Sequence, residues 1–261
     1  MPTLKLMLVR HGQSVGNTEG RMEGQSSTGL TPLGEQQAWR LGQHLAATGW
    51  QPTQIYCSPL GRATATLAAL VAGFGGSSPA ASAAGAGGQP QPVDFPAAVP
   101  LPPGPAVPLA FSDDLKEYDA GIFTGLTWAE ARDRTPDLCH CLETSLDWQP
   151  IPQAETLAQG SARAQRFVDH LLSHHRNGDR ILVLSHHWIL QHIVARLLGC
   201  DRAWGLPIDN TACFEFWLDH DRWNRPAPDR LNTELWQIKR FNDTRHQLTA
   251  PAVKTEAAPP K

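Results

Sequence analysis

Two continuous apolar runs constrain the fold of this chain more than any other feature of its sequence. Residues 4–9 read LKLMLV and residues 180–184 read RILVL, with a single charged residue in each run. Such runs are typical of parallel strands that are buried on both faces. Each run leads into a polar stretch that contains histidine, Arg10-His11-Gly12 after the first and Ser185-His186-His187 after the second. Because ligands of open parallel sheets bind at the carboxyl ends of strands, these stretches are the first candidates for a functional site.

Helical patterns alternate with further strand patterns along the chain. Thr31-Pro32 and Ser58-Pro59 each combine a capping side chain with a proline at the first helical position, which predicts a helix start at both places. The other expected elements are helices at residues 157–173 and 188–198 and strands at residues 54–57, 211–218 and 233–239. Alternating strands and helices predict an α/β fold, a three-layer α/β/α sandwich with a mostly parallel central sheet.

The segment at residues 73–110 differs in composition from the rest of the chain. It contains 7 Gly, 9 Pro and 9 Ala, and Asp94 is its only charged residue. This composition predicts a flexible insertion without helix or strand, with a proline-rich ligand for a partner as the alternative. We therefore expect one domain over residues 1–248, interrupted by this insertion and followed by a disordered tail at residues 249–261.

Charge and hydropathy argue against several classes of protein. The chain has 22 Lys+Arg against 25 Asp+Glu, a formal net charge of −3, and no basic cluster, which argues against bulk nucleic-acid binding. No apolar run approaches the roughly 18 residues of a membrane span. The apolar stretch near the N-terminus is too short for a secretory signal, so we expect a cytoplasmic protein with no membrane or nucleic-acid partner.

The spacing of cysteine and histidine gives little indication of a metal or of disulfides. Five cysteines without a CxxC pair argue against a disulfide framework or a zinc ribbon. Cys139-His140-Cys141 is one alternative for a metal site, but it lacks a second cluster at ligand spacing. His170 and His174, four residues apart, are another, although a solvated helix end is more typical of such a pair. We expect free thiols, no metal and no cofactor.

The residues at the two strand ends have the chemistry of an anion site. Arg10 offers a fork of donors, His11 a nucleophilic imidazole and Gly12 a close approach of the backbone. Arg62 lies near the start of an expected helix, where free N–H groups favour anions. Together with His186, these residues would form a site for a phosphate dianion, whereas an incidental surface Arg-His pair is the alternative for the first stretch alone.

Several sequence blocks, in a fixed order, resemble the histidine phosphatase superfamily, also called phosphoglycerate mutase-like. The blocks are RHGQSxxN at 10–17, GRMEG at 20–24, LTPLGEQQA at 30–38, SPLGRAxxT at 58–66, LxExxxGxxxG at 115–125 and LSH at 184–186. The resemblance covers most of the chain outside the insertion and the tail. It implies the phosphoglycerate mutase-like fold and a small phosphorylated substrate.

The resemblance also implies roles for individual residues. His11 would attack phosphorus and become a phosphohistidine, and Glu117 would protonate the departing alkoxide and then activate water. Arg10, Arg62 and His186 would hold the phosphoryl oxygens, so that no metal is required. From the residues alone Glu117 could also be a solvated carboxylate, but its Leu-x-Glu-x-x-x-Gly frame favours the acid. The residues expected near the rest of the substrate are Asn17, Glu23, Gly24 and His187.

Departures from the superfamily's pattern favour hydrolysis over isomerisation. The mutase branch has an arginine directly after the acid and a lysine after the second glycine of that block, where this chain has Tyr118 and Trp128. A mutase needs such cations for the second phosphate and the carboxylate of its bisphosphate. We therefore expect a phosphomonoesterase, with a phosphoglycerate mutase as the alternative. A non-catalytic phosphate-binding scaffold is a further alternative. The sequence also leaves open a homodimer, in which the partner is a second copy of the chain.

Two positions near the expected site stay ambiguous in the sequence. His187 stands where the superfamily usually has a glycine, so His186 and His187 could be confused, and the Leu-Ser-His frame favours His186. Glu23 stands where many relatives have threonine or glutamine. It could repel a second anionic group of a substrate, or it could point to solvent.

Overall fold

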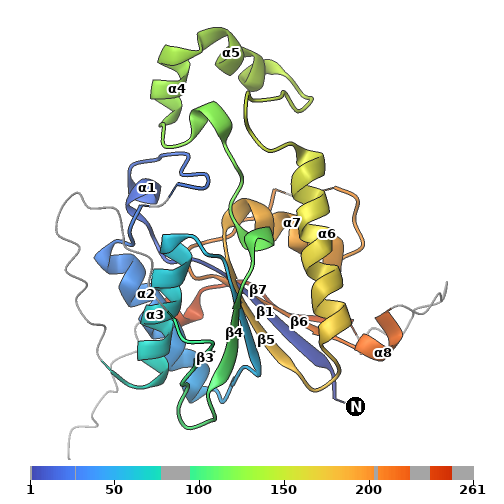
Figure 1. Cartoon of the computed structure of the whole chain (residues 1–261). Helices are drawn as coiled ribbons and strands as arrows, with labels where there is room; N and C mark the ends of the chain where they lie inside the picture. The colour runs from blue at the N-terminus through green and yellow to red at the C-terminus, as the bar shows by residue number, and fades with distance from the viewer. Residues whose placement is uncertain (1, 27, 78–94, 203–204, 224–235, 249–261) are drawn as a thin grey trace, which may run out of the picture.

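A seven-stranded sheet in the order β3-β4-β2-β5-β1-β6-β7 lies at the centre of the protein (Figure 1). The strands are β1 (Leu4–Arg10), β2 (Gln54–Cys57), β3 (Ala98–Val99), β4 (Val107–Phe111), β5 (Arg180–Ser185), β6 (Cys213–Leu218) and β7 (Trp236–Asp243). The computed structural model describes the chain apart from residues 1, 27, 78–94, 203–204, 224–235 and 249–261. The expected tail and the middle of the expected insertion therefore lie outside the described residues.

The centre of the sheet is parallel and its edges are antiparallel. Strands β4, β2, β5 and β1 run parallel to one another, whereas β6, β7 and β3 pair antiparallel with their neighbours. In this register Arg10 pairs with Ser185 and Cys57 pairs with Leu184. The carboxyl ends of β1, β2 and β5 therefore meet at one edge, which brings three of the sequence blocks together.

Helices cover both faces of this sheet. They are α1 (Val15–Thr18), α2 (Pro32–Ala47), α3 (Gly61–Phe74), α4 (Trp128–Arg134), α5 (Pro136–Thr144), α6 (Leu157–His174), α7 (His187–Leu197) and α8 (His220–Trp223), with short 3-10 helices η1 (Asp113–Leu115), η2 (Gly121–Phe123) and η4 (Arg245–Gln247). Within the described residues, none of these helices is long and apolar enough to cross a membrane.

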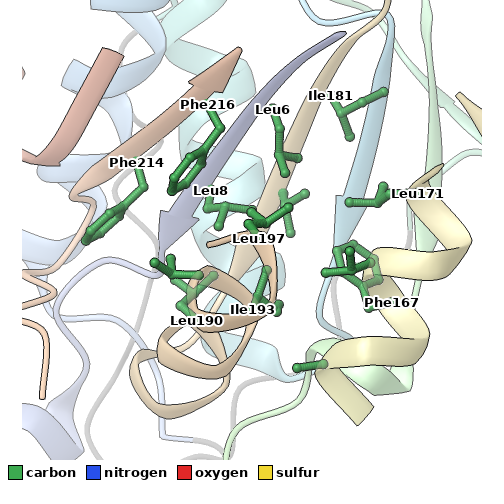
Figure 2. Packing of buried hydrophobic residues seen from close by; sticks show 14 of the residues in the cluster. Leu6, Leu8, Phe167, Leu171, Ile181, Leu190, Ile193, Leu197, Phe214 and Phe216 are labelled. Carbon is green, nitrogen blue, oxygen red and sulfur yellow. The ribbon is translucent and has the colours of Figure 1, made fainter. Parts of the chain in front are cut away.

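Alternate side chains of the central strands enter two separate cores. Leu6 and Leu8 of β1 pack with Phe167 of α6 and with residues of α7 (Figure 2). Met7 and Val9, on the opposite face of β1, pack with residues of α2 and α3. Because both faces of β1 are covered, its sequence is apolar throughout. This arrangement confirms the predicted three-layer α/β/α sandwich.

The predicted elements around the sheet are found with shifts of a few residues. The helix expected at Thr31-Pro32 begins there, with the Thr31 hydroxyl accepting a hydrogen bond from Gly34 N. The helix expected at Ser58-Pro59 begins at Gly61 instead, so that prediction is wrong by two residues. The reason is that the Ser58 hydroxyl does not cap the helix but lies 2.7 Å from His186 Nε2.

Part of the expected insertion is strand, so the prediction that residues 73–110 contain no regular structure is wrong. Strand β3 and all of β4 except Phe111 lie within this range, and α3 extends into it. Val99 and Val107 pair across the two strands and are buried together with Leu101. β3 contains no proline, and the one proline inside β4, Pro108, precedes the residues of β4 that pair with β2, so it removes no N–H group from that part of the ladder.

A small helical layer lies beyond the carboxyl ends of the strands and was not predicted from the sequence. It consists of α4, α5 and η2, which lie above the sheet edge in Figure 1. Phe123, Leu126, Ala131 and Cys139 form its own small apolar cluster. Few apolar residues mark these short helices, so their periodicity is weak in the sequence. The layer covers the edge where the sequence blocks meet.

Removing residues 73–110 tests the correction to the insertion. We expect this deletion, closed with a short Gly/Ser linker, to lower the melting temperature by about 10 °C or more, because it removes β3, all of β4 but its last residue, and the buried side chains of Phe74, Val99, Leu101 and Val107. As a control, replacing only residues 80–92 removes no described residue, and we expect a much smaller shift. Thermal melting followed by circular dichroism measures both. Equal melting of the two variants would contradict the assignment of β3 and β4 to the core.

Candidate active site

His11 lies directly after β1, and its imidazole has one defined tautomer. Its Nδ1 lies 2.7 Å from Gly12 O. Since a carbonyl oxygen only accepts hydrogen bonds, the proton is on Nδ1 and the lone pair is on Nε2. Arg62 Nε donates to this Nε2 over 3.3 Å. The lone pair of the His11 ring is therefore on Nε2, and a guanidinium lies beside it.

The loop after β1 packs closely against the backbone at the start of α2, which explains why two residues of the sequence blocks are glycines. A Cβ atom on Gly12 would lie 2.4 Å from Gly34 O, and a Cβ atom on Gly34 would lie 2.1 Å from Gln13 O, so neither position has room for a side chain. Gly12 N donates to the Thr66 hydroxyl at 2.9 Å, and this hydroxyl donates to Arg62 O at 2.7 Å. These contacts fix the loop after β1 against α2 and α3.

Arg62 is in the first turn of α3 and is only 1% exposed. Its Nη1 donates to Ser26 O at 2.6 Å and its Nη2 donates to Gly24 O at 2.8 Å. Gly24 therefore acts through its carbonyl oxygen. Burial lowers the pKa of Arg62 from its ordinary value, while the neighbouring Glu23 and Glu117 raise it. The guanidinium stays charged, because arginine is not deprotonated in proteins.

The structure brings His186, the last residue before α7, next to His11. The two ring centroids are 5.1 Å apart, and His186 is completely buried. Its Nε2 lies 2.7 Å from the Ser58 hydroxyl, and its Nδ1 has no hydrogen-bond partner among the described residues. The side chain of His187 lies elsewhere, with its Nε2 2.9 Å from Gln191 Nε2. The two histidines are therefore clearly distinguished by their places in the structure.

Glu117 follows η1 and is held by backbone N–H groups. Its Oε1 accepts hydrogen bonds from Tyr118 N at 2.9 Å and from Trp188 N at 3.1 Å. Trp188 is in the first turn of α7, where free N–H groups and the helix dipole favour a carboxylate. A lone surface carboxylate would not have these partners, so Glu117 belongs to the same site as the histidines.

Arg163 of α6 holds the backbone that carries Glu117, and nothing in the sequence had indicated this residue. Its Nη1 donates to Asp114 O at 3.0 Å and to Lys116 O at 2.5 Å. Its Nε and Nη2 donate to the two carboxylate oxygens of Glu155 at 2.9 and 2.6 Å. Because its partners on the acid's loop are carbonyl oxygens, which every residue has, no sequence signal could have revealed the contact.

Glu23 is buried beside Arg62, so the interpretation in which it points to solvent is wrong. Its Oε2 accepts hydrogen bonds from the Ser14 hydroxyl at 2.6 Å and from Asn17 Nδ2 at 3.2 Å, and lies 3.9 Å from Arg62 Nε. A Cβ atom on Gly16 would lie 2.4 Å from Glu23 Cγ, which shows that the glycine makes room for this side chain. The Glu23 carboxylate therefore lies inside the site, in a position fixed by Ser14, Asn17 and Arg62.

Asn17 connects Arg10 to the loop between α7 and β6, which the sequence blocks do not include. Asn17 Oδ1 accepts hydrogen bonds from Asn210 Nδ2 at 3.0 Å and from Arg10 Nη2 at 3.5 Å. Arg10 Nη1 donates to Ile208 O at 2.6 Å. Its Nε is buried and has no hydrogen-bond partner among the described residues. Ile208 and Asn210 were missed because no motif marks them.

Burial and positive charge keep the two histidines neutral. The pKa of His11 lies well below the ordinary value of 6.5, first because the ring is buried and then because Arg62 and Arg10 disfavour a second positive charge. The pKa of His186 is lowered well below 6.5 by burial, by Arg62 and by His11. A neutral His11 keeps the lone pair on Nε2 available near pH 7.

These residues surround one cavity of about 430 Å³. Its lining includes all the expected site residues except His186, whose ring lies beside that of His11: Arg10, His11, Asn17, Glu23, Gly24, Arg62, Glu117 and His187. The rest of the lining is mostly apolar: Met22, Tyr118, Ala120, Phe123, Ile151 and Trp188, with Arg21 and Gln191. The cavity is therefore polar where the histidine lies and largely apolar elsewhere.

The two alternatives for a metal site do not assemble. In the described part of the chain, no group of three or more His, Cys, Asp or Glu side chains could hold a metal ion. The rings of His170 and His174 stack with their centroids 4.1 Å apart, and His170 Nε2 lies 3.2 Å from the Tyr56 hydroxyl. Cys139 is buried and Cys141 is exposed, and both are free thiols.

Comparison with known proteins identifies the family. The chain matches the model of the histidine phosphatase superfamily (branch 1) over residues 6–82 and 98–226. It therefore belongs to this superfamily. The gap in the match falls between residues 82 and 98, which is narrower than the insertion expected from composition.

Individual relatives include phosphatases and a mutase. The chain is 26% identical to the metal-independent phosphoserine phosphatase of Arabidopsis thaliana, over 76% of this chain and 71% of that one. It is 28% identical to the protein named "Probable phosphoglycerate mutase GpmB" of Erwinia tasmaniensis, over 75% of each chain. The crystal structure of the alpha-ribazole phosphatase from Shigella flexneri, at 21% identity, superposes with a TM-score of 0.65 over 92% of this chain and 96% of that one, and so shares the fold. Membership of this family supports phosphatase or mutase activity.

The buried neutral His11 makes stability depend on pH in a defined direction. An unfolded histidine titrates near pH 6.5, whereas the pKa of folded His11 lies well below this value. Below pH 6.5 the unfolded chain binds more protons, so the free energy of unfolding falls as the pH falls. We expect His11→Asn to make this dependence shallower by about 1 kcal/mol per pH unit between pH 5 and 6.

Urea unfolding at several pH values measures this difference. The exposed His174 provides the matched control, since His174→Asn removes a histidine that is not buried. We expect the control to keep the slope of the wild type. A slope for His11→Asn equal to that of the wild type would contradict the neutral, buried state of this imidazole.

Proposed function

We propose that the protein is a metal-independent phosphomonoesterase that hydrolyses a small phosphorylated metabolite through a phosphohistidine on His11. The observation that carries this proposal is the lone pair on His11 Nε2, which faces the buried Arg62 Nε, on a side chain that lines the same cavity as Glu117. The similarity to a metal-independent phosphoserine phosphatase supports it.

The phosphate dianion would bind to donors that have no partner in the protein. Arg10 Nε and His186 Nδ1 are buried without a hydrogen-bond partner among the described residues. Buried donors without partners cost free energy, and phosphoryl oxygens would accept hydrogen bonds from them. Together with Arg62, they would supply the positive charge and the N–H groups that stabilise the phosphoryl group during transfer.

In the first step, His11 Nε2 forms a bond to phosphorus while the bond between phosphorus and the ester oxygen breaks. Glu117 gives a proton to the departing oxygen, which so leaves as a neutral alcohol. The Nδ1 proton of His11 stays on its hydrogen bond to Gly12 O, where it stabilises the charge that develops on the ring.

In the second step, a water molecule replaces the alcohol. Glu117, now a carboxylate held by Tyr118 N and Trp188 N, accepts a proton from this water as its oxygen attacks phosphorus. The bond between phosphorus and Nε2 breaks, and His11 regains its lone pair. Release of inorganic phosphate returns the site to its starting state.

Phosphoglycerate mutase is the second candidate function, and the similarity to GpmB favours it. A mutase must also hold the second anionic groups of its substrate. Among the described residues that line the cavity, Arg21 is the only arginine or lysine besides Arg10 and Arg62. Arg21 is already paired with Glu19 at 2.6 Å and with Glu130 at 2.9 Å. This pairing supports hydrolysis over isomerisation.

His11→Ala tests the covalent intermediate. We expect at least about a thousandfold loss of phosphate release, because removing a nucleophile leaves only binding and electrostatic stabilisation. Wild-type protein quenched during turnover should carry acid-labile phosphate, and His11→Ala should carry none. His170→Ala, outside the cavity, serves as the control and should keep activity. Phosphate release by His11→Ala at the wild-type rate would contradict the phosphohistidine, and formation of 2-phosphoglycerate from 3-phosphoglycerate would favour the mutase.

Glu117→Gln tests the general acid through the leaving group. We expect a loss of several orders of magnitude on alkyl phosphates, whose alkoxides need a proton, and a far smaller loss in the first step on p-nitrophenyl phosphate. A burst of nitrophenol could then precede slow hydrolysis of the phosphohistidine. Asp113→Asn, a matched change to an exposed residue of η1, should affect neither ester. Equal losses on both esters would instead make Glu117 a residue that binds or positions the phosphate.

A further inference from the structure

An aromatic wall lines the cavity next to the acid. Tyr118 and Trp188 both line the cavity, and their ring centroids are 4.8 Å apart. Phe123 and Ile151 extend the apolar lining. The phosphate-binding donors account for the polar part of the cavity, but the proposed chemistry uses none of these four side chains. Their presence therefore concerns the part of the substrate beyond the ester oxygen.

The same two aromatic residues hold the carboxylate of Glu117 through their backbone N–H groups. The ring wall and the acid are consequently fixed relative to one another. Trp188 is further confined, because its ring centroid lies 4.2 Å from that of His192 and a Cβ atom on Gly160 would lie 2.0 Å from its ring. An alcohol whose oxygen receives the proton of Glu117 would therefore begin next to a preformed aromatic surface.

The charges around the cavity disfavour a leaving alcohol that carries an anionic group. Besides Glu117, the lining contains the buried carboxylate of Glu23. Among the described lining residues, Arg10 and Arg62 lie beside His11, and Arg21 is held in two ion pairs. None of these arginines is therefore available to pair with a carboxylate of the substrate. A buried anion without a cationic partner costs free energy.

The hydroxyl of Tyr118 adds a polar element to the wall. This hydroxyl is buried and has no hydrogen-bond partner among the described residues. Burial raises the pKa of Tyr118 to about 12, so the phenol keeps its proton and can donate it in a hydrogen bond. An acceptor atom on the alcohol would pair with this donor.

We propose that the substrate is a phosphate monoester of an uncharged alcohol that carries a flat aromatic or heteroaromatic ring. The ring stacks on Tyr118 and Trp188, and an acceptor atom on the alcohol receives the hydrogen bond of the Tyr118 hydroxyl. This assignment rests on the proposed phosphomonoesterase function and specifies its substrate class.

Three monoesters compare the classes directly: 2-phenylethyl phosphate, O-phosphoserine and 3-phosphoglycerate. All three share the CH2–O–phosphate group, and the serine and glycerate oxygens are better leaving groups than that of 2-phenylethanol, so a preference for the phenylethyl ester must come from binding. We expect kcat/KM for 2-phenylethyl phosphate to be at least about tenfold higher than for the other two, since stacking and the absence of an unpaired anion both favour it.

Two variants test the wall itself. We expect Tyr118→Arg to move the ratio of kcat/KM values at least tenfold toward 3-phosphoglycerate, because it replaces the ring by a cation. Gln43→Arg, which adds the same charge on the exposed face of α2, should leave the ratio unchanged. Trp188→Leu should lower kcat/KM for 2-phenylethyl phosphate more than for O-phosphoserine, and it tests the same wall if Tyr118→Arg does not fold.

The outcomes separate this proposal from the function on which it rests. Hydrolysis of p-nitrophenyl phosphate that depends on His11, together with a preference for O-phosphoserine or 3-phosphoglycerate, would overturn the substrate class and leave the phosphatase in place. An unchanged ratio in a folded Tyr118→Arg or Trp188→Leu variant would also overturn it. Absence of hydrolysis of every monoester, p-nitrophenyl phosphate included, would overturn both.

Discussion

A buried guanidinium organises the carboxyl edge of the sheet. A charge that leaves water must be paired and hydrogen-bonded by protein atoms, or it costs several kcal/mol. Arg62 meets this requirement with the carbonyl oxygens of Gly24 and Ser26, with His11 Nε2 and with the carboxylate of Glu23. These partners come from the end of β1 and from the loop after α1. The contacts of this one side chain therefore hold the end of β1, the loop after α1 and the start of α3 together around the cavity.

The sequence predicted those parts of the molecule in which a local pattern has one physical cause. Continuous apolar runs indicated β1 and β5 because both faces of these strands are buried. Gly12 and Gly34, two glycines of the sequence blocks, lie where two backbone segments nearly touch. Thr66, from another block, lies where its hydroxyl joins the backbone of Gly12 to that of Arg62. The side chains at these strand and helix ends lie together because parallel strands share one carboxyl edge.

Other features depend on contacts that leave no trace in a local pattern. β3 and β4 were missed because composition averages hid Val99 and Val107 among prolines and alanines. Arg163 was missed because its partners on the loop of the acid are backbone carbonyl oxygens. The orientation of Glu23 could not be decided from the sequence, since it depends on the space that Gly16 leaves. The partners of Arg163 are distant in sequence and are met through their backbone, and the neighbour that decides the orientation of Glu23 has no side chain.

The way in which Glu117 is held has a consequence for how this site can diverge. Its carboxylate contacts the backbone N–H groups of Tyr118 and Trp188, which remain with every side chain except that of proline. Substitutions at these two positions can therefore reshape the aromatic lining of the cavity while the carboxylate of Glu117 stays in place. For the proposed phosphatase, this arrangement separates substrate choice from catalysis: one replacement at either position changes the surface beside the carboxylate but leaves its backbone partners unchanged.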